Sequence, residues 1–145
     1  MITLKTHNTL VAGFTFLIMM LAAGMAHSAE KLSVSAAHQK ASNGEVLLVD
    51  VRTPGEWRET KIGASATPIS MHEAGFLKKL LAAAGNDKSK PVALICAVGG
   101  RSSWLQGELK RRGYTNVYDV AEGMMGSPAW PGWLKAGLPT KPYSP

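Results

Sequence analysis

A single cysteine, Cys96, stands where the sequence could carry nucleophilic chemistry. It ends the apolar run of residues 92–96 and precedes a short stretch that contains Gly99, Gly100 and Arg101. Glycines let a backbone turn its amide hydrogens inward, and a helix start adds unpaired N–H groups with partial positive charge. Such a loop favours an anion at its centre, and a thiolate is both an anion and a strong nucleophile. The spacing therefore predicts a reactive cysteine in an anion-binding loop.

Two other interpretations of Cys96 are less informative. As the only cysteine of the chain it has no partner for an internal disulfide. It could be a small buried core residue, as free cysteines often are, or stand by chance in a structural strand-to-helix turn. The two glycines and the arginine that follow favour the chemical interpretation over both.

The elements that would position this loop alternate between strands and helices. Apolar runs of strand length are expected at residues 46–51, 92–96 and 117–120, and helical periods at residues 33–41, 72–84, 102–112 and 132–136. This alternation favours a parallel sheet with helices on its faces. Sites in open sheets of this kind form beyond the carboxyl ends of the strands, where Cys96 would stand.

The first 28 residues have the character of an export signal. An apolar stretch at residues 11–23 is followed by small residues, Ala26 and Ser28, at the spacing of a cleavage site. An uncleaved membrane anchor is the alternative, but the apolar stretch is shorter than the roughly 20 residues that span a bilayer. We therefore expect residues 1–28 to be a secretory signal peptide. Residues 29–145 then form one periplasmic or secreted domain without stable membrane insertion.

Composition excludes several classes of protein. Hydrophobic residues make up 46% of the chain and charged residues 18%, which is the balance of a globular domain. The net charge is +6, but the basic residues are scattered, and the tight run at residues 110–112 suits the end of a helix. Nucleic-acid binding is therefore not expected. No cluster with metal-ligand spacing is present in the sequence, so no metal is expected either.

Four ordered segments resemble the rhodanese family. Residues 96–102 are similar to its active-site loop, Cys-x-x-Gly-x-Arg-Ser, and residues 48–57 to its Asp-Val-Arg segment. Residues 120–124 and 135–139 resemble its closing segment, so that the likeness covers a core of about residues 32–140. The resemblance implies an α/β fold with about five parallel strands flanked by helices on both faces. It also implies transfer of a sulfane sulfur from a donor such as thiosulfate to a thiophilic acceptor.

The resemblance also implies roles for individual residues. Cys96 would attack the donor and hold the sulfur as a persulfide, without any other cofactor, and Arg101 would orient the loop or help to bind the donor. The loop residues that would cradle the persulfide are Ala97, Val98, Gly99, Gly100 and Ser102. The residues that would form a structural ion-pair set near the site are Asp50, Arg52 and Glu56. The partners implied are a small anionic donor and a thiol, cyanide-like or protein acceptor.

Departures from the family pattern leave alternatives open. Ala97 and Val98 replace polar or basic residues, which weakens the expected capture of thiosulfate. A carrier or redox module that uses the same cysteine without efficient turnover is therefore the second hypothesis. Phosphatase or arsenate-reductase chemistry is disfavoured, because those enzymes use a longer loop than the four residues between Cys96 and Arg101. Trp130 and Trp133 could cover the site or bind a partner, although capping of the core is the preferred interpretation.

Overall fold

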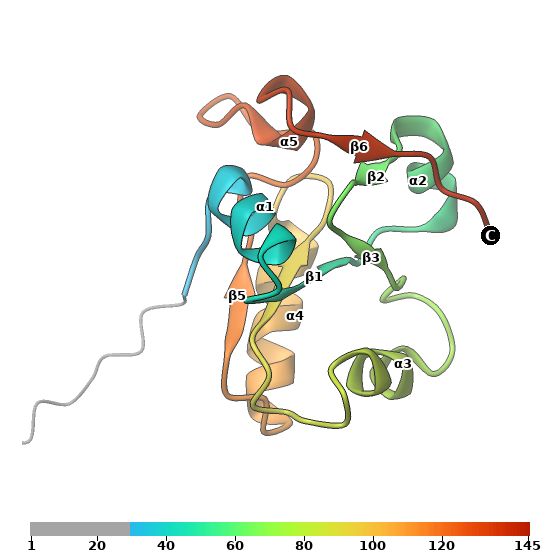
Figure 1. Cartoon of the computed structure of the whole chain (residues 1–145), viewed down its shortest axis with the longest axis vertical. Coiled ribbons are helices and arrows are strands. Elements are labelled where there is room, and N and C mark those ends of the chain that lie inside the picture. Colours follow the sequence, from blue (N-terminus) through green and yellow to red (C-terminus); the bar gives the residue numbers. More distant parts are fainter. Residues whose placement is uncertain (1–29) are drawn as a thin grey trace, which may run out of the picture.

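The computed structural model describes residues 30–145 (Figure 1). The expected signal peptide, residues 1–28, lies outside the described residues. Within residues 30–145, no helix is both long enough and apolar enough to span a membrane.

A parallel sheet forms the centre of the fold. Its strands are β1 (Leu47–Asp50), β3 (Thr67–Pro68), β4 (Val92–Ile95) and β5 (Val117–Asp119), in the order β3-β1-β4-β5. All three pairings are parallel. Every residue of β4 is buried, because helices cover both faces of the sheet. This double burial explains why the strand is a continuous apolar run without alternation.

The sheet has four strands, whereas about five were expected from the sequence. Beyond β5, Lys31 contributes only an isolated parallel bridge to Asp119. A separate two-stranded sheet pairs β2 (Ile62–Gly63) antiparallel with β6 (Thr140–Lys141). It ties the C-terminal segment to the connection between β1 and β3.

Two hydrophobic clusters attach helices to the two faces of the sheet, as expected. On one face lie α1 (Val34–Ser42) and α5 (Gly132–Lys135), whose buried side chains pack with Leu48 of β1. On the other face lie α3 (Phe76–Ala83) and α4 (Gly100–Arg111). Figure 1 shows the β4–α4 connection at the end of the sheet toward which the strands point. The fold therefore presents the Cys96 loop at the carboxyl edge of a central strand.

A short helix, α2 (Pro54–Thr60), follows β1 and carries Glu56 toward the same edge. It begins with a capping box, in which the Thr53 hydroxyl accepts from the Glu56 N–H and the Glu56 carboxylate accepts from the Thr53 N–H. Pro54 in the first turn has a backbone φ angle that suits a helix. Trp57 is buried against Tyr143, with ring centroids 4.8 Å apart. The position of Glu56 is thus fixed by local sequence and by packing.

Candidate active site

Cys96 directly follows β4, and its side chain lies on the floor of the loop that leads to α4. Its sulfur accepts a hydrogen bond from the Gly99 N–H at 3.1 Å and lies 3.4 Å from the Ser102 hydroxyl oxygen. Only 1% of the residue is exposed. The Gly99 amide at the helix start therefore faces the sulfur and favours a negative charge there, whereas the Ser102 hydroxyl beside it donates to the Gly99 carbonyl.

The loop turns sharply because Gly99 adopts a left-handed conformation with φ of 92°. A Cβ atom at this position would lie 2.2 Å from the carbonyl oxygen of Ala121. The Gly99 carbonyl accepts hydrogen bonds from the Ser102 hydroxyl and the Ser103 N–H, both at 3.1 Å. The helix therefore begins at Gly100, earlier than the start at residue 102 expected from the sequence, because Gly99 acts as its cap.

The segment after β5 holds the loop from the other side. The Met124 N–H donates to the Cys96 carbonyl at 2.8 Å, and the Met125 N–H donates to the Ala97 carbonyl at 2.9 Å. Gly123 allows this close approach, since a Cβ atom there would lie 2.3 Å from the Ala97 carbonyl oxygen. The backbone of the loop is therefore fixed by hydrogen bonds and by the close backbone contacts that Gly99 and Gly123 allow.

Arg101 forms a bidentate ion pair with Glu56. Its two terminal nitrogens donate to the two carboxylate oxygens at 3.0 and 2.5 Å, and each side chain is about one-third exposed. The hydrogen bond from Arg101 is the main reason that the pKa of Glu56 falls from 4.5 to about 2. The pKa of Arg101 is raised, first by Glu56 and more weakly by attraction to Cys96 and Asp50. Arg101 is thus held by α2 within electrostatic range of the sulfur.

The structure divides the expected ion-pair set of Asp50, Arg52 and Glu56 between two pairs, Asp50 with Arg52 and Glu56 with Arg101. Arg52 donates to both carboxylate oxygens of Asp50, and its remaining nitrogens reach the Thr60 hydroxyl at 2.6 Å and the Lys61 carbonyl at 2.8 Å. Asp50 and Arg52 are fully buried and fix the chain around α2. The hydrogen bonds of Glu56 run instead to Thr53 and Arg101, because the capping box turns its carboxylate toward the loop.

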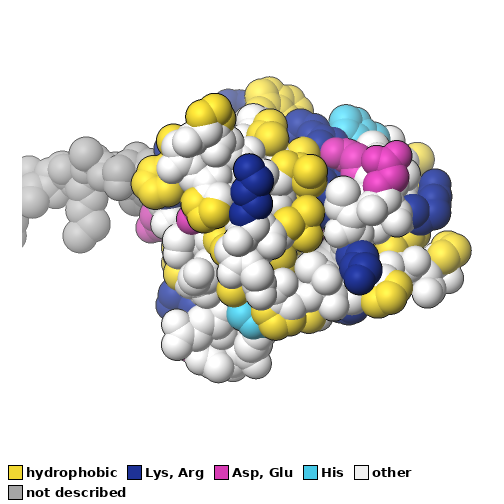
Figure 2. All heavy atoms as spheres, turned by 90° about the horizontal axis from the view of Figure 1, so that it is seen from above, with side chains coloured by type: hydrophobic (Ala, Val, Ile, Leu, Met, Phe, Trp, Pro, Cys, Tyr) yellow, Lys and Arg dark blue, Asp and Glu magenta, His cyan; other side chains and the backbone are white. Residues whose placement is uncertain are grey.

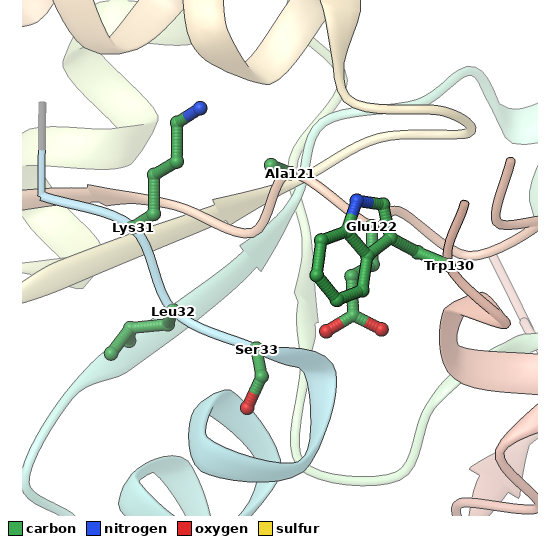
Figure 3. A pocket seen from close by; sticks show the side chains of 6 residues that line it. All are labelled: Lys31, Leu32, Ser33, Ala121, Glu122 and Trp130. Atoms are coloured by element: carbon green, nitrogen blue, oxygen red, sulfur yellow. The ribbon is translucent and has the colours of Figure 1, made fainter.

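The two tryptophans near the C-terminus have different environments. Trp133 is fully buried and its indole N–H donates to the Pro139 carbonyl at 3.0 Å, which confirms the core interpretation for this residue. Trp130 is exposed and stands beside Glu122 at a shallow hollow of about 240 Å³ (Figure 3). The hollow is also lined by Lys31, Leu32, Ser33 and Ala121. The core interpretation therefore fails for Trp130.

Exposed apolar side chains lie on the loop and on the segments that adjoin it. Val98 is 60% exposed at the rim, and the side chains of Trp104 and Met125 are also exposed. Figure 2 looks onto the end of the molecule toward which the strands point and shows hydrophobic side chains interspersed with a few charged ones. Residues 30–145 contain no group of acidic, histidine or cysteine side chains that could hold a metal ion. Around Cys96 Sγ the loop thus presents the Gly99 amide, and Arg101 of the same loop is paired with Glu56.

Sequence reasoning missed a buried acid near the loop. Asp119 ends β5 with 1% of its surface exposed, and burial raises the pKa of its carboxyl group. The sequence did offer a signal for it, because Asp119 is an acidic residue at the carboxyl end of β5, the strand next to β4.

Comparison with known proteins agrees with this geometry. The rhodanese-like domain family matches residues 33–127, about two-thirds of the chain. This chain belongs to the rhodanese-like domain family. An uncharacterized protein of Rickettsia rickettsii, the RP600 homolog, is 29% identical over 109 residues, which cover 68% of this chain and 85% of that protein.

Solved rhodanese-like structures show the same fold. The polysulfide-sulfur transferase homodimer of Wolinella succinogenes is 29% identical, with a TM-score of 0.58 over 79% of this chain and 80% of that one. A rhodanese-like domain protein of Staphylococcus aureus is 25% identical, with a TM-score of 0.55 over 77% of this chain and 98% of that one. The rhodanese-like α/β fold expected from the sequence is thereby confirmed.

The Glu56–Arg101 pair should make stability depend on pH. Because folding lowers the pKa of Glu56, its contribution is fully present above 4.5 and is lost as the pH falls through about 2. We expect Glu56→Gln to lower the free energy of unfolding by about 1–2 kcal/mol at neutral pH, a value discounted for partial exposure. Urea unfolding at neutral pH and at about pH 2.5 measures this. Equal deficits at both pH values would contradict the assignment.

Proposed function

We propose that this protein is a sulfurtransferase whose Cys96 alternates between a thiolate and a persulfide. The observation that carries the proposal is the Gly99 N–H donated to Cys96 Sγ at the start of α4. The thiolate attacks the outer sulfur of the donor, so that a bond from Cys96 to that sulfur forms. The bond from that sulfur to the rest of the donor breaks, and the leaving group takes the electron pair. With thiosulfate as donor, the leaving group is sulfite.

The second half of the cycle returns the free thiolate. A nucleophilic acceptor such as cyanide or a thiolate attacks the outer persulfide sulfur, and Cys96 leaves with the electron pair of the S–S bond. The outer sulfur of the persulfide carries negative charge until then. The inward-facing amide, the helix start and the nearby Arg101 all favour this anion.

The loop chemistry favours a sulfur-rich donor such as polysulfide over thiosulfate. Ala97 and Val98 bring no charged group to the rim, and the guanidinium of Arg101 is already engaged by Glu56. The sulfonate group of thiosulfate would therefore find few unpaired hydrogen-bond donors. A chain of polarisable sulfur atoms can instead pack against the exposed Val98 side chain. The similarity to the Wolinella polysulfide-sulfur transferase supports the same donor class.

Arg101→Ala tests this proposal with two donors. Removal of the guanidinium takes away a positive charge and leaves Glu56 unpaired near the site. We expect sulfur loading of Cys96 from thiosulfate to fall about tenfold, the equivalent of about 1.4 kcal/mol, and loading from polysulfide to fall less. Intact mass spectrometry at short incubation times measures both rates.

Arg58→Ala is the matched control, because Arg58 is an exposed cation on the same helix as Glu56 and forms no ion pair with any of residues 30–145. It should leave both rates unchanged. Unchanged loading by Arg101→Ala from either donor would contradict the assigned role of Arg101.

A further inference from the structure

A second hollow lies at the end of the molecule opposite the Cys96 loop. It has a volume of about 310 Å³ and is formed by α3, the loop that precedes β4 and the C-terminal end of α4. In Figure 1, α3 and the last turn of α4 lie at the end of the sheet away from the β4–α4 connection. Because α4 has 12 residues, its length of about 18 Å separates the two ends. The residues that line the hollow are Leu77, Lys78, Leu81, Lys88, Arg112 and Tyr114.

The wall of this hollow is apolar. Leu77 has 36% of its surface exposed, which is high for a large hydrophobic side chain. Leu81 is partly buried and packs against the hydrophobic cluster that contains Tyr114. Pockets of a few hundred Å³ with walls of this kind are typical of sites for small organic molecules. The hollow therefore suits the apolar part of a ligand.

Three cationic side chains surround the apolar wall. Lys78 and Lys88 form no ion pair with any residue that the structure describes, whereas Arg112 pairs with Glu108 at 2.7 Å. The carboxylate of Asp87, which is next to Lys88 in the sequence, accepts hydrogen bonds within its own turn. Positive charge therefore exceeds negative charge at the rim, so the hollow favours an anionic group over a neutral or cationic one.

Lys88 is held in place at the rim. Its ammonium group donates to the Arg112 carbonyl at 2.9 Å and lies 5.7 Å from the centre of the Tyr114 ring. The Lys88 carbonyl accepts from the Thr115 N–H at 3.1 Å, so the backbone is fixed as well. An ammonium group has three hydrogens, and two of them remain for a ligand. A fixed cation loses little freedom when an anion binds to it.

We propose that this hollow binds an amphipathic organic anion. The apolar part of the ligand packs against Leu77, Leu81 and Tyr114, and its phosphate, sulfonate or carboxylate group accepts hydrogen bonds from Lys78 and Lys88. A soluble anionic amphiphile and an anionic lipid share this chemistry. The hollow is remote from Cys96, so the inference does not depend on the proposed function.

Isothermal titration calorimetry with octyl phosphate, below its critical micelle concentration, tests this proposal. We expect one site, with an affinity at least about tenfold higher than for inorganic phosphate, which has no apolar part, or for octyl glucoside, which has no charge. An increase in NaCl from about 50 mM to about 500 mM should weaken the binding of octyl phosphate severalfold. The absence of binding, or an equal affinity for either control compound, would overturn the proposal.

Lys78→Met tests the position of the site. It removes one exposed charge and keeps an apolar stem, and it should weaken the binding of octyl phosphate up to about fivefold, the scale of one surface ion pair. Lys141→Met is the matched control, because Lys141 is an exposed lysine of β6 and should not affect binding. Equal affinities of the two variants would contradict the site. Sulfur loading of Cys96 should be the same in both, which separates this proposal from the proposed function.

Cosedimentation with lipid vesicles distinguishes the two sources of the ligand. Sedimentation with vesicles of phosphatidylglycerol and phosphatidylcholine, but not of phosphatidylcholine alone, would assign the hollow to lipid headgroups if Lys78→Met reduces it. A protein that binds octyl phosphate but stays in the supernatant has a soluble ligand. Sedimentation that Lys78→Met retains in full would count against the hollow as the site of lipid binding.

Discussion

Cys96→Ser should abolish sulfur transfer from thiosulfate or polysulfide to cyanide, with a loss of at least about 10³-fold, the scale of removing a catalytic nucleophile. The serine hydroxyl would occupy nearly the same place beside Gly99 and Ser102 but cannot form a persulfide. The free energy of unfolding should change by only about 1 kcal/mol, since the replacement is close in size. Thiocyanate formation and urea unfolding measure the two effects.

Ser103→Ala is the control for Cys96→Ser, because its side chain is exposed and it should transfer sulfur at the rate of the unmodified protein. Transfer that survives in Cys96→Ser would show that another group carries the sulfur. Aryl phosphate hydrolysis that depends on Cys96 would instead support the phosphatase hypothesis that the loop length disfavours.

Gly99→Ala should destabilise the protein by about 3 kcal/mol and should lower sulfur loading severely. Alanine resists the φ of 92°, at about 1–2 kcal/mol, and its Cβ atom would also meet the Ala121 carbonyl oxygen at 2.2 Å. Relief of that contact must move the Gly99 amide away from Cys96 Sγ, which it now reaches at 3.1 Å. Thermal unfolding and the rate of sulfur loading measure the two losses.

Gly100→Ala is a matched control for this prediction. A Cβ atom at Gly100 has nothing within 4 Å, and the residue is the first of α4, where alanine favours a helix. Gly100→Ala should therefore load sulfur at the rate of the unmodified protein. Its free energy of unfolding should be equal to that of the unmodified protein or slightly higher. A loss as large as that of Gly99→Ala would show that any substitution in the loop is harmful, and would contradict the specific role of the Gly99 conformation.

Much of the fold was predictable because its signals are local. Neighbouring residues determine the buried run that forms β4, the glycine that ends α4 and the alternation of strands and helices. The position of Cys96 at a strand end depends on the same local signals. The start of α4 was placed too late because the cap is a left-handed glycine and has no capping side chain. The expected number of strands, about five, was too high, because Lys31 supplies only an isolated bridge at the edge beyond β5.

The pairings within the site could not be read from the sequence, because they join distant segments. Glu56 and Arg101 are 45 residues apart, and the resemblance to the family had placed Glu56 in one set with Asp50 and Arg52. The hydrogen bond from the Met124 N–H to the Cys96 carbonyl likewise joins two segments that no local pattern brings together. Periodicity predicts which elements form and which face is buried, but the contacts between polar groups at the sheet edge follow only from the assembled fold.

Intact mass spectrometry after incubation with a sulfur donor tests the central claim most directly. The unmodified protein should gain the mass of one sulfur atom, lose it again when cyanide is added, and release an equal amount of thiocyanate. Cys96→Ser should gain nothing under the same conditions. A protein that gains no sulfur from thiosulfate or polysulfide, or a gain that Cys96→Ser retains, would contradict the assignment of Cys96 as the sulfur-carrying nucleophile.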